Sequence, residues 1–314
     1  MSTIVLVTPR SYGKHSTEPI ELLRQAGCEV RLNPHGRILT KEEMREAIQG
    51  VHAIVVGVDP LDRDVLQAAE QLRLIVKYGV GTDNIDLQAA AERGIPVLTT
   101  PGANTEAVAD YTFGLMLAAA RRIVPIDSGC RSLDWRKQTT IDVSGRTLGL
   151  VGLGQIGKAV VRRAGGFGMQ IIAFDAYRDE TFAAQHAVRY ADTLDELLAQ
   201  ADFVSLHVPL TGDTRHLIGR EQLGSMRQSA VLINTARGGL IDEEALLEAL
   251  QQQKIWGAGL DVFEQEPPAR PELLTLDNLV IGSHCAASTV QAIDNMGHLA
   301  ARHILDYLSE VKHG

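Results

Sequence analysis

The sequence predicts two α/β domains, each built on a parallel β-sheet that helices cover. Apolar segments of strand length alternate with helical segments along the whole chain, and this alternation is typical of parallel sheets. The length of 314 residues also exceeds that of most single domains. A glycine-rich loop begins almost halfway along the chain, so the residues before it are expected to form a separate domain.

The first third of the chain predicts a complete small α/β domain. Its expected strands are Thr3–Thr8, Cys28–Leu32, Ala53–Val56, Leu74–Lys77 and Pro96–Thr99. Its expected helices are Pro19–Ala26, Lys41–Ile48, Asp62–Ala69 and Leu87–Arg93. After turn residues at 100–105, Glu106–Arg121 predicts a long helix of mostly small and apolar residues, suited to burial between domains.

The second half of the chain predicts a doubly wound sheet of six parallel strands. The expected strands are Thr147–Val151, Gln170–Phe174, Phe203–His207, Ala230–Asn234, Trp256–Leu260 and Leu279–Ile281. The expected helices are Lys158–Phe167, Thr193–Ala199, Arg220–Met226 and Glu243–Gln252. We expect a final helix, at about Ser288–Leu308, to return to the first domain and complete it.

The glycine-rich loop joins the first strand of this sheet to its first helix, and residues 150–157 read Leu-Val-Gly-Leu-Gly-Gln-Ile-Gly. Gly152 permits a tight turn, Gly154 lets the backbone approach a pyrophosphate, and Gly157 lets helix and strand pack closely. Gln155 and Ile156 lie where a helix N-terminus would offer N–H groups and positive dipole to phosphates. The alternative is a glycine-rich turn in an ordinary βαβ unit.

Asp175 ends the next strand, 18 positions after Gly157, and completes a dinucleotide-binding pattern. Its carboxylate would accept hydrogen bonds from the adenosine ribose and repel a 2′-phosphate, which favours NAD (NADH) over NADP. Arg178 lies near enough to leave that preference open. The predicted organisation is a Rossmann-type NAD domain, residues 103–285, inserted into a smaller flavodoxin-like substrate domain, residues 1–102 and 286–314.

Composition narrows the function classes. A net charge of −9 argues against binding to nucleic acid or to an anionic membrane, which both need a basic face. Cys28, Cys130 and Cys285 lack the spacing of metal ligands, so we expect no metal, and their odd number favours free thiols in a reducing cytoplasm. No signal peptide is expected, and the longest apolar stretch, Phe113–Ala120, is too short to span a bilayer.

Three candidate catalytic residues follow three predicted strands: Arg237, Glu266 and His284. Ligands of open α/β sheets lie outside the carboxyl ends of the strands, so these residues would share the edge that holds the nicotinamide. Taken singly, each has an ordinary explanation: a surface arginine, a loop carboxylate, a hydrogen-bonded histidine. His207 ends another strand and is expected to line the adenosine pocket, and Cys285 is expected to be a packing residue.

These residue types suit hydride transfer to a 2-keto acid. The carbonyl oxygen needs a proton donor that titrates near neutrality, which histidine provides. A neighbouring carboxylate stabilises the imidazolium, and a guanidinium can grip the substrate carboxylate and polarise the carbonyl.

Motifs along nearly the whole chain resemble the D-isomer-specific 2-hydroxyacid dehydrogenases, in particular their phosphoglycerate dehydrogenase-like branch. The motifs span residues 77–86, 107–114, 149–157, 206–211, 234–239 and 260–267. The resemblance implies that Arg237, Glu266 and His284 form the catalytic set. It implies that Val80 and Gly81 N–H groups bind the substrate carboxylate, in a substrate site that includes Lys77 and Tyr78. Further cofactor contacts are expected at Thr105, His207, Pro209, Thr214, Thr235, Ala236 and Asp261, of which Asp261 would face the nicotinamide carboxamide.

The resemblance also implies that the domain of the chain ends is mobile and that closure excludes water. It implies a homodimer built through the nucleotide domain, with Ile123–Val143 as the candidate dimer arm.

Two departures bear on the substrate and the site. Phosphoglycerate dehydrogenases typically carry an arginine after the third strand, where this chain has Gly57-Val-Asp, although Lys77 stands where they commonly have arginine. The last motif reads Ser283-His-Cys, whereas Pro-His followed by an aliphatic residue is usual. The first departure weakens the case for a phosphorylated substrate, and the second predicts different packing around the histidine.

We therefore expect an NAD-dependent oxidoreductase that interconverts a small D-2-hydroxy acid and its 2-keto acid. The pair 3-phosphoglycerate and 3-phosphohydroxypyruvate is one candidate; a hydroxypyruvate or glyoxylate reductase and a sugar-acid dehydrogenase are alternatives. A different class, an NAD-sensing protein like the corepressors that share this architecture, also stays open.

Overall fold

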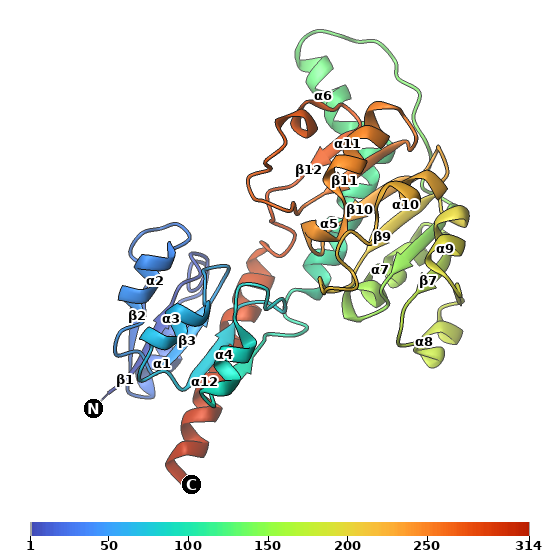
Figure 1. Cartoon of the computed structure of the whole chain (residues 1–314). Coiled ribbons are helices and arrows are strands. Elements are labelled where there is room, and N and C mark those ends of the chain that lie inside the picture. The colour runs from blue at the N-terminus through green and yellow to red at the C-terminus, as the bar shows by residue number, and fades with distance from the viewer. Residues whose placement is uncertain (1, 314) are drawn as a thin grey trace. The chain divides into compact units, whose positions relative to one another are not determined.

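The computed structural model describes residues 2–313, which form two compact units. One unit contains the residues up to Asn104 and those from Ser288 onward, and the other runs from Thr105 to Ala287. The chain therefore leaves the first unit, builds the whole of the second and returns, as the colours of Figure 1 trace.

The first unit has a five-stranded parallel sheet in the order β2-β1-β3-β4-β5, the flavodoxin-like order that the sequence predicts. The strands are β1 (Thr3–Val7), β2 (Cys28–Leu32), β3 (Ala53–Val56), β4 (Leu74–Lys77) and β5 (Val97–Leu98). The helices are α1 (Glu18–Gln25), α2 (Lys41–Ala47), α3 (Arg63–Ala68), α4 (Leu87–Glu92) and α12 (Val290–His313). Every residue of β3 and β4 is buried, as expected for central strands covered on both faces.

The last helix completes this unit. Ala300, Ala301 and Ile304 of α12 are fully buried in the same core as Val5 and Leu23, and α12 packs against α1 and β4. The small alanine side chains let the helix approach the sheet closely, so the C-terminal segment belongs to the core of the first unit.

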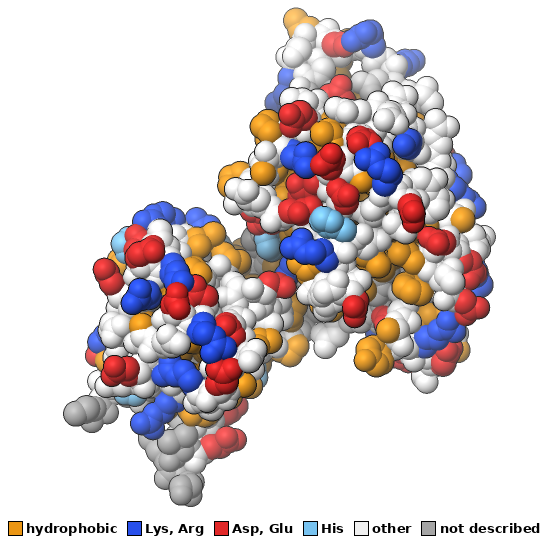
Figure 2. All heavy atoms as spheres, viewed as in Figure 1, with side chains coloured by type: hydrophobic (Ala, Val, Ile, Leu, Met, Phe, Trp, Pro, Cys, Tyr) orange, Lys and Arg blue, Asp and Glu red, His pale blue; other side chains and the backbone are white. Residues whose placement is uncertain are grey.

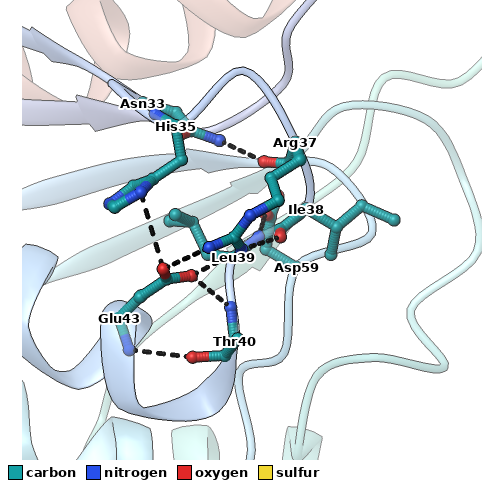
Figure 3. Close-up of polar contacts among 8 residues, drawn as sticks. All are labelled: Asn33, His35, Arg37, Ile38, Leu39, Thr40, Glu43 and Asp59. Carbon is teal, nitrogen blue, oxygen red and sulfur yellow. Dashed lines mark hydrogen bonds and ion pairs between the residues drawn. The ribbon is translucent and has the colours of Figure 1, made fainter.

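The loop between β2 and α2 is held by a set of polar contacts (Figure 3). Arg37 grips Glu43 with two hydrogen bonds, and Thr40 and Glu43 cap the start of α2 reciprocally. Arg37 and the Thr40 N–H lower the pKa of Glu43 to about 2. The Leu39 N–H donates to Asp59 Oδ1 at 2.8 Å, which ties this loop to the segment after β3.

The second unit has a seven-stranded parallel sheet in the order β12-β11-β10-β9-β6-β7-β8, a doubly wound arrangement. The strands are β6 (Thr147–Val151), β7 (Gln170–Phe174), β8 (Val188–Tyr190), β9 (Phe203–Leu206), β10 (Val231–Asn234), β11 (Gly257–Leu260) and β12 (Leu279–Ile281). The helices are α5 (Thr105–Ala120), α6 (Ile123–Arg131), α7 (Gln155–Gly166), α8 (Glu180–Gln185), α9 (Leu194–Gln200), α10 (Arg220–Ser225) and α11 (Glu243–Gln251). Short 3₁₀ turns occupy Gly238–Leu240 and Pro271–Thr275.

The sequence predicts six strands in this unit, whereas the structure has seven. The seventh strand, β8, is three residues long and lies at the edge of the sheet. Val188 is its only buried residue, so the sequence has no apolar run there. Helix α6 was also not expected, because it contains Pro125 and Gly129 and buries none of its side chains. Helix α7 begins three residues earlier than expected, directly after Gly154.

The surface matches the weakly acidic composition. On the face drawn in Figure 2, acidic and basic side chains are interspersed over both units. No helix among the described residues is both long and apolar enough to cross a bilayer. Within residues 2–313, no cluster of histidine, cysteine and carboxylate side chains has the arrangement of a metal site.

Candidate active site

The glycine-rich loop adopts the close approaches that the sequence predicts. Gly152 has φ of 99°, and a Cβ there would lie 2.7 Å from the carbonyl oxygen of His207. A Cβ on Gly157 would lie 2.4 Å from the carbonyl oxygen of Gly152, so helix α7 packs directly on the turn. A Cβ on Gly154, the N-cap of α7, would meet nothing within 4 Å. The N-terminal N–H groups of α7, at Gln155 and Ile156, therefore begin beside open space, as a phosphate site requires.

Asp175 lies beside this loop. Its Oδ2 accepts a hydrogen bond from Leu153 N at 2.6 Å, and its Oδ1 accepts one from Tyr177 N at 2.8 Å. Arg178 instead donates to Ala191 O at 3.2 Å and Asp192 Oδ1 at 2.9 Å. The Arg178 guanidinium thus contacts the residues after β8, and its hydrogen bonds do not go to Asp175.

The sheet order brings the three candidate catalytic loops together. Strands β10, β11 and β12 are neighbours, and all three are parallel. The residues that follow them therefore leave the same edge of the sheet: Arg237 after β10, Glu266 after β11 and His284 after β12.

Glu266 and His284 form a direct pair. His284 Nδ1 lies 2.8 Å from Glu266 Oε2, and the other carboxylate oxygen accepts a hydrogen bond from Phe263 N at 3.2 Å. Burial acts to raise the pKa of Glu266, but the hydrogen bond and the charge of His284 outweigh it. With further contributions from Phe263 N–H and the Arg237 charge, the pKa lies below its usual value, so Glu266 is ionised at neutral pH.

Asn234 shapes the turn that presents Arg237. This fully buried side chain accepts from Ala236 N at 3.0 Å and donates to Arg237 O at 2.8 Å. Gly238, which follows Arg237, leaves no room for a side chain, since a Cβ there would lie 1.9 Å from the carbonyl carbon of Phe263. The loop of Arg237 and the loop of Glu266 therefore pack backbone against backbone.

Asp261 holds the histidine loop. Its backbone oxygen accepts from His284 N at 2.7 Å, and its two carboxylate oxygens accept from Cys285 N at 3.0 Å and Ala286 N at 2.8 Å. Three consecutive N–H groups thus bind one buried residue, and His284 takes a left-handed conformation with φ of 56°. Sequence reasoning assigned Asp261 to the cofactor and missed this contact with the loop.

Among the other expected cofactor residues, those between 207 and 214 follow β9, and those at 235 and 236 follow β10. His207 Nε2 lies 2.9 Å from Ser205 Oγ, and burial lowers the pKa of His207 to about 4, so this imidazole is neutral near pH 7. Thr214 Oγ1 donates to Pro209 O at 2.7 Å and shapes the loop after β9. Thr235 directly follows β10, beside Ala236, whereas Thr105 is the first residue of α5.

The expected substrate residues belong to the first unit, at the carboxyl end of β4. Lys77 is only 5% exposed, and its ammonium donates to Gly57 O and to Asn84 Oδ1. Tyr78 Oη donates to Ile293 O at 2.6 Å. Val80 N and Gly81 N donate none of the hydrogen bonds described for residues 2–313. Sequence reasoning missed Asn84, whose side chain also donates to Gly57 O and Asp59 O and joins Lys77 to the loop after β3.

Comparison with known proteins identifies a family match. Residues 113–286 match the family described as "D-isomer specific 2-hydroxyacid dehydrogenase, NAD binding domain". The chain is 48% identical over 269 residues to a D-3-phosphoglycerate dehydrogenase of Methanocaldococcus jannaschii, a match covering 85% of this chain. This chain spans only about half of that relative, 51% of its length.

A glyoxylate reductase of Korarchaeum cryptofilum is 45% identical over 276 residues, covering 85% of this chain and 83% of the relative. Among solved structures, the TT0316 protein of Thermus thermophilus superposes with a TM-score of 0.89 at 40% identity. That superposition covers 98% of this chain and 97% of the other.

Proposed function

This chain belongs to the D-isomer specific 2-hydroxyacid dehydrogenase family, an NAD-dependent oxidoreductase family, and from that premise we propose its catalytic residues and substrate class. The proposed reaction interconverts a small, unphosphorylated D-2-hydroxy acid and its 2-keto acid. Arg237, Glu266 and His284 are the proposed catalytic set. The observation that carries this assignment is the 2.8 Å contact between His284 Nδ1 and Glu266 Oε2, beside the loop of Arg237.

In the direction of reduction, His284 gives a proton to the carbonyl oxygen of the keto acid. Its Nδ1 is occupied by Glu266, which leaves Nε2 for the substrate. NADH, held by the nucleotide domain, would supply the hydride to the carbonyl carbon. Glu266 stabilises the imidazolium, and Arg237 orients the substrate through its carboxylate and polarises the carbonyl. A pure cofactor-sensing role would not need this histidine–carboxylate pair.

The glycine-rich loop is proposed to hold the NAD pyrophosphate, with Asp175 on the adenosine ribose. The open space above Gly154 and the two backbone N–H groups already bound by Asp175 support these roles. The other proposed cofactor contacts are Gln155, Ile156, Thr105, His207, Pro209, Thr214, Thr235, Ala236 and Asp261.

The substrate carboxylate is proposed to bind the N–H groups of Val80 and Gly81, with Tyr78 nearby. Lys77 supports an unphosphorylated substrate. Its ammonium is buried and bound to Gly57 O and Asn84 Oδ1, so it serves the loop after β3 instead of a phosphate. Gly57 itself brings no cation. We therefore favour a keto acid of the glyoxylate or hydroxypyruvate type over 3-phosphohydroxypyruvate.

A homodimer through the second unit is also proposed, with residues 123–143 as the arm. Helix α6 buries no side chain, and the segment after it carries Leu133 and Trp135 at 92% and 80% exposure. Large apolar side chains this exposed are typical of an interface.

The test of the function is NADH consumption with a panel of 2-keto acids, run on the wild type and on His284→Ala. We expect turnover with glyoxylate or hydroxypyruvate, and a loss of about 10²–10⁴-fold in the variant. Quenching of protein fluorescence by NADH should show unchanged cofactor binding. Near wild-type turnover by His284→Ala would show that His284 is not the proton donor.

A further inference from the structure

Two consecutive residues of α5 contact two of the catalytic loops. Cys285 Sγ, next to His284, donates to Tyr111 Oη at 3.2 Å. Thr112 Oγ1 lies 3.0 Å from the hydroxyl of Thr235, two residues before Arg237. One turn of a single helix therefore touches both the loop of the proposed proton donor and the loop of the proposed substrate-binding arginine.

The Tyr111 contact is tightly packed. The Cys285 thiol also lies 3.6 Å from Asp261 Oδ1, the oxygen that accepts from Cys285 N. A Cβ on Gly282 would lie 2.2 Å from that oxygen and 2.7 Å from Tyr111 Oη. Burial raises the pKa of Tyr111, and the Cys285 contact and the charge of Asp261 raise it further, so the phenol stays protonated. The histidine loop therefore rests directly on the tyrosine hydroxyl.

The Thr112 contact has a defined direction. Thr112 is fully buried, and its single hydroxyl proton goes to Val108 O at 2.9 Å, within α5. In the pair with Thr235, Thr112 therefore accepts and Thr235 donates. Both hydroxyls are satisfied by this arrangement, so the start of the Arg237 loop is tied to the helix.

We propose that Tyr111 and Thr112 are positioning residues through which α5 sets the placement of His284 and Arg237 relative to each other. This inference rests on the proposed roles of those two residues. In this chain serine, and not proline, precedes His284, and Cys285, which follows it, makes the thiol–phenol contact with α5. The helix thus supplies a constraint on the loop that a rigid residue would otherwise provide.

The two contacts should have separable kinetic effects. Tyr111→Phe removes the acceptor of the Cys285 thiol and loosens the proton donor, so kcat should fall about 2- to 10-fold while KM for the keto acid stays unchanged. Thr112→Val leaves Thr235 without its acceptor and loosens the Arg237 loop, so KM for the keto acid should rise by a similar factor. Thr112→Ser keeps the hydroxyl and should restore the wild-type KM.

The tyrosine contact also allows a double-mutant cycle. Cys285→Ala should reproduce Tyr111→Phe, and the double variant should be no slower than either single one, because all three lose the same contact. Tyr307→Phe, on α12, is the matched control and should behave as wild type. Thermal unfolding and the dissociation constant of NADH are measured for every variant.

The inference is overturned if Tyr111→Phe and Thr112→Val both keep wild-type kcat and KM. It is also overturned if each changes both parameters alike together with a lower midpoint of unfolding, because that pattern means a general structural role. These results differ from a failure of the proposed function, which would appear as an active His284→Ala enzyme.

Discussion

Replacing Glu266 by glutamine removes the charge beside His284 while keeping the shape of the side chain. His284 Nδ1 and Glu266 Oε2 are 2.8 Å apart, and the two side chains are 41% and 38% exposed. Two unit charges about 4 Å apart attract by roughly 4 kcal/mol at an effective dielectric constant of about 20. Partial exposure reduces this to about 1–2 kcal/mol, so the rate of reduction near neutral pH should fall by about 5- to 30-fold.

The pH dependence gives a sharper readout than the rate. The pKa of Glu266 lies below its usual value of 4.5, so its contribution is present above that lowered pKa and is lost as the pH falls through it. The wild type should therefore keep activity into the acid range. In Glu266→Gln this acid-side loss should disappear, because the glutamine amide does not titrate.

The assay is the initial rate of NADH consumption at saturating keto acid across the pH range. Glu264→Gln is the matched control, since Glu264 Oε1 forms a similar pair with His216 Nε2 at 3.0 Å, only two residues away in the chain. A Glu266→Gln enzyme with the wild-type rate and pH profile would refute the reasoning. An equal effect from Glu264→Gln would refute it too, by showing a general electrostatic effect.

Three further predictions concern the cofactor, the substrate and the assembly. Asp175→Ala should raise the ratio of NADPH to NADH efficiency, measured as kcat/KM for each cofactor; an unchanged ratio would mean that another residue sets the preference. Gly57→Arg should raise kcat/KM for 3-phosphohydroxypyruvate by about tenfold but not for hydroxypyruvate. A Cβ at this position meets its nearest atoms at 3.5 Å, so a folded variant is expected, and equal gains on both acids would contradict a phosphate contact. Trp135→Asp should shift the molecular mass seen by sedimentation from dimer to monomer, and a wild-type enzyme that is monomeric would end the dimer proposal.

The strands with buried apolar runs could be predicted closely from the sequence. Ala53–Val56 and Leu74–Lys77 have the predicted limits because each is a short apolar run buried on both faces. Strand β8 was not predicted, because an edge strand of three residues needs few apolar positions and so leaves no clear pattern in the sequence. Helix α6 was not predicted because its sequence contains proline and glycine and none of its side chains is fully buried in this unit.

The positions of the candidate site residues after strand ends could be predicted from the sequence, but their contacts could not. The order of residues after strand ends pointed to Arg237, Glu266 and His284, because parallel strands end at one edge. The contact of Asp261 with the histidine loop could not be predicted this way, since it depends on the backbone path of residues 284–286. The burial of Lys77 was equally hidden, because its acceptors, Gly57 O and Asn84 Oδ1, lie 20 and 7 positions away along the chain.

The contact between Gly238 and Phe263 has a consequence for how this scaffold can change. A Cβ at 238 would fall 1.9 Å from a backbone carbon, so neither loop can be altered at this point without displacing the other. Position 57, in the first unit, has room for a side chain. Mutational libraries that seek new substrates should therefore vary residues 57 and 58, of which Val58 is exposed, and leave 238 untouched. Substrate preference would then change through residues of the first unit, while the loops of the second unit that carry the proposed catalytic residues stay the same. Related enzymes that differ in the acid they reduce can share those loops unchanged.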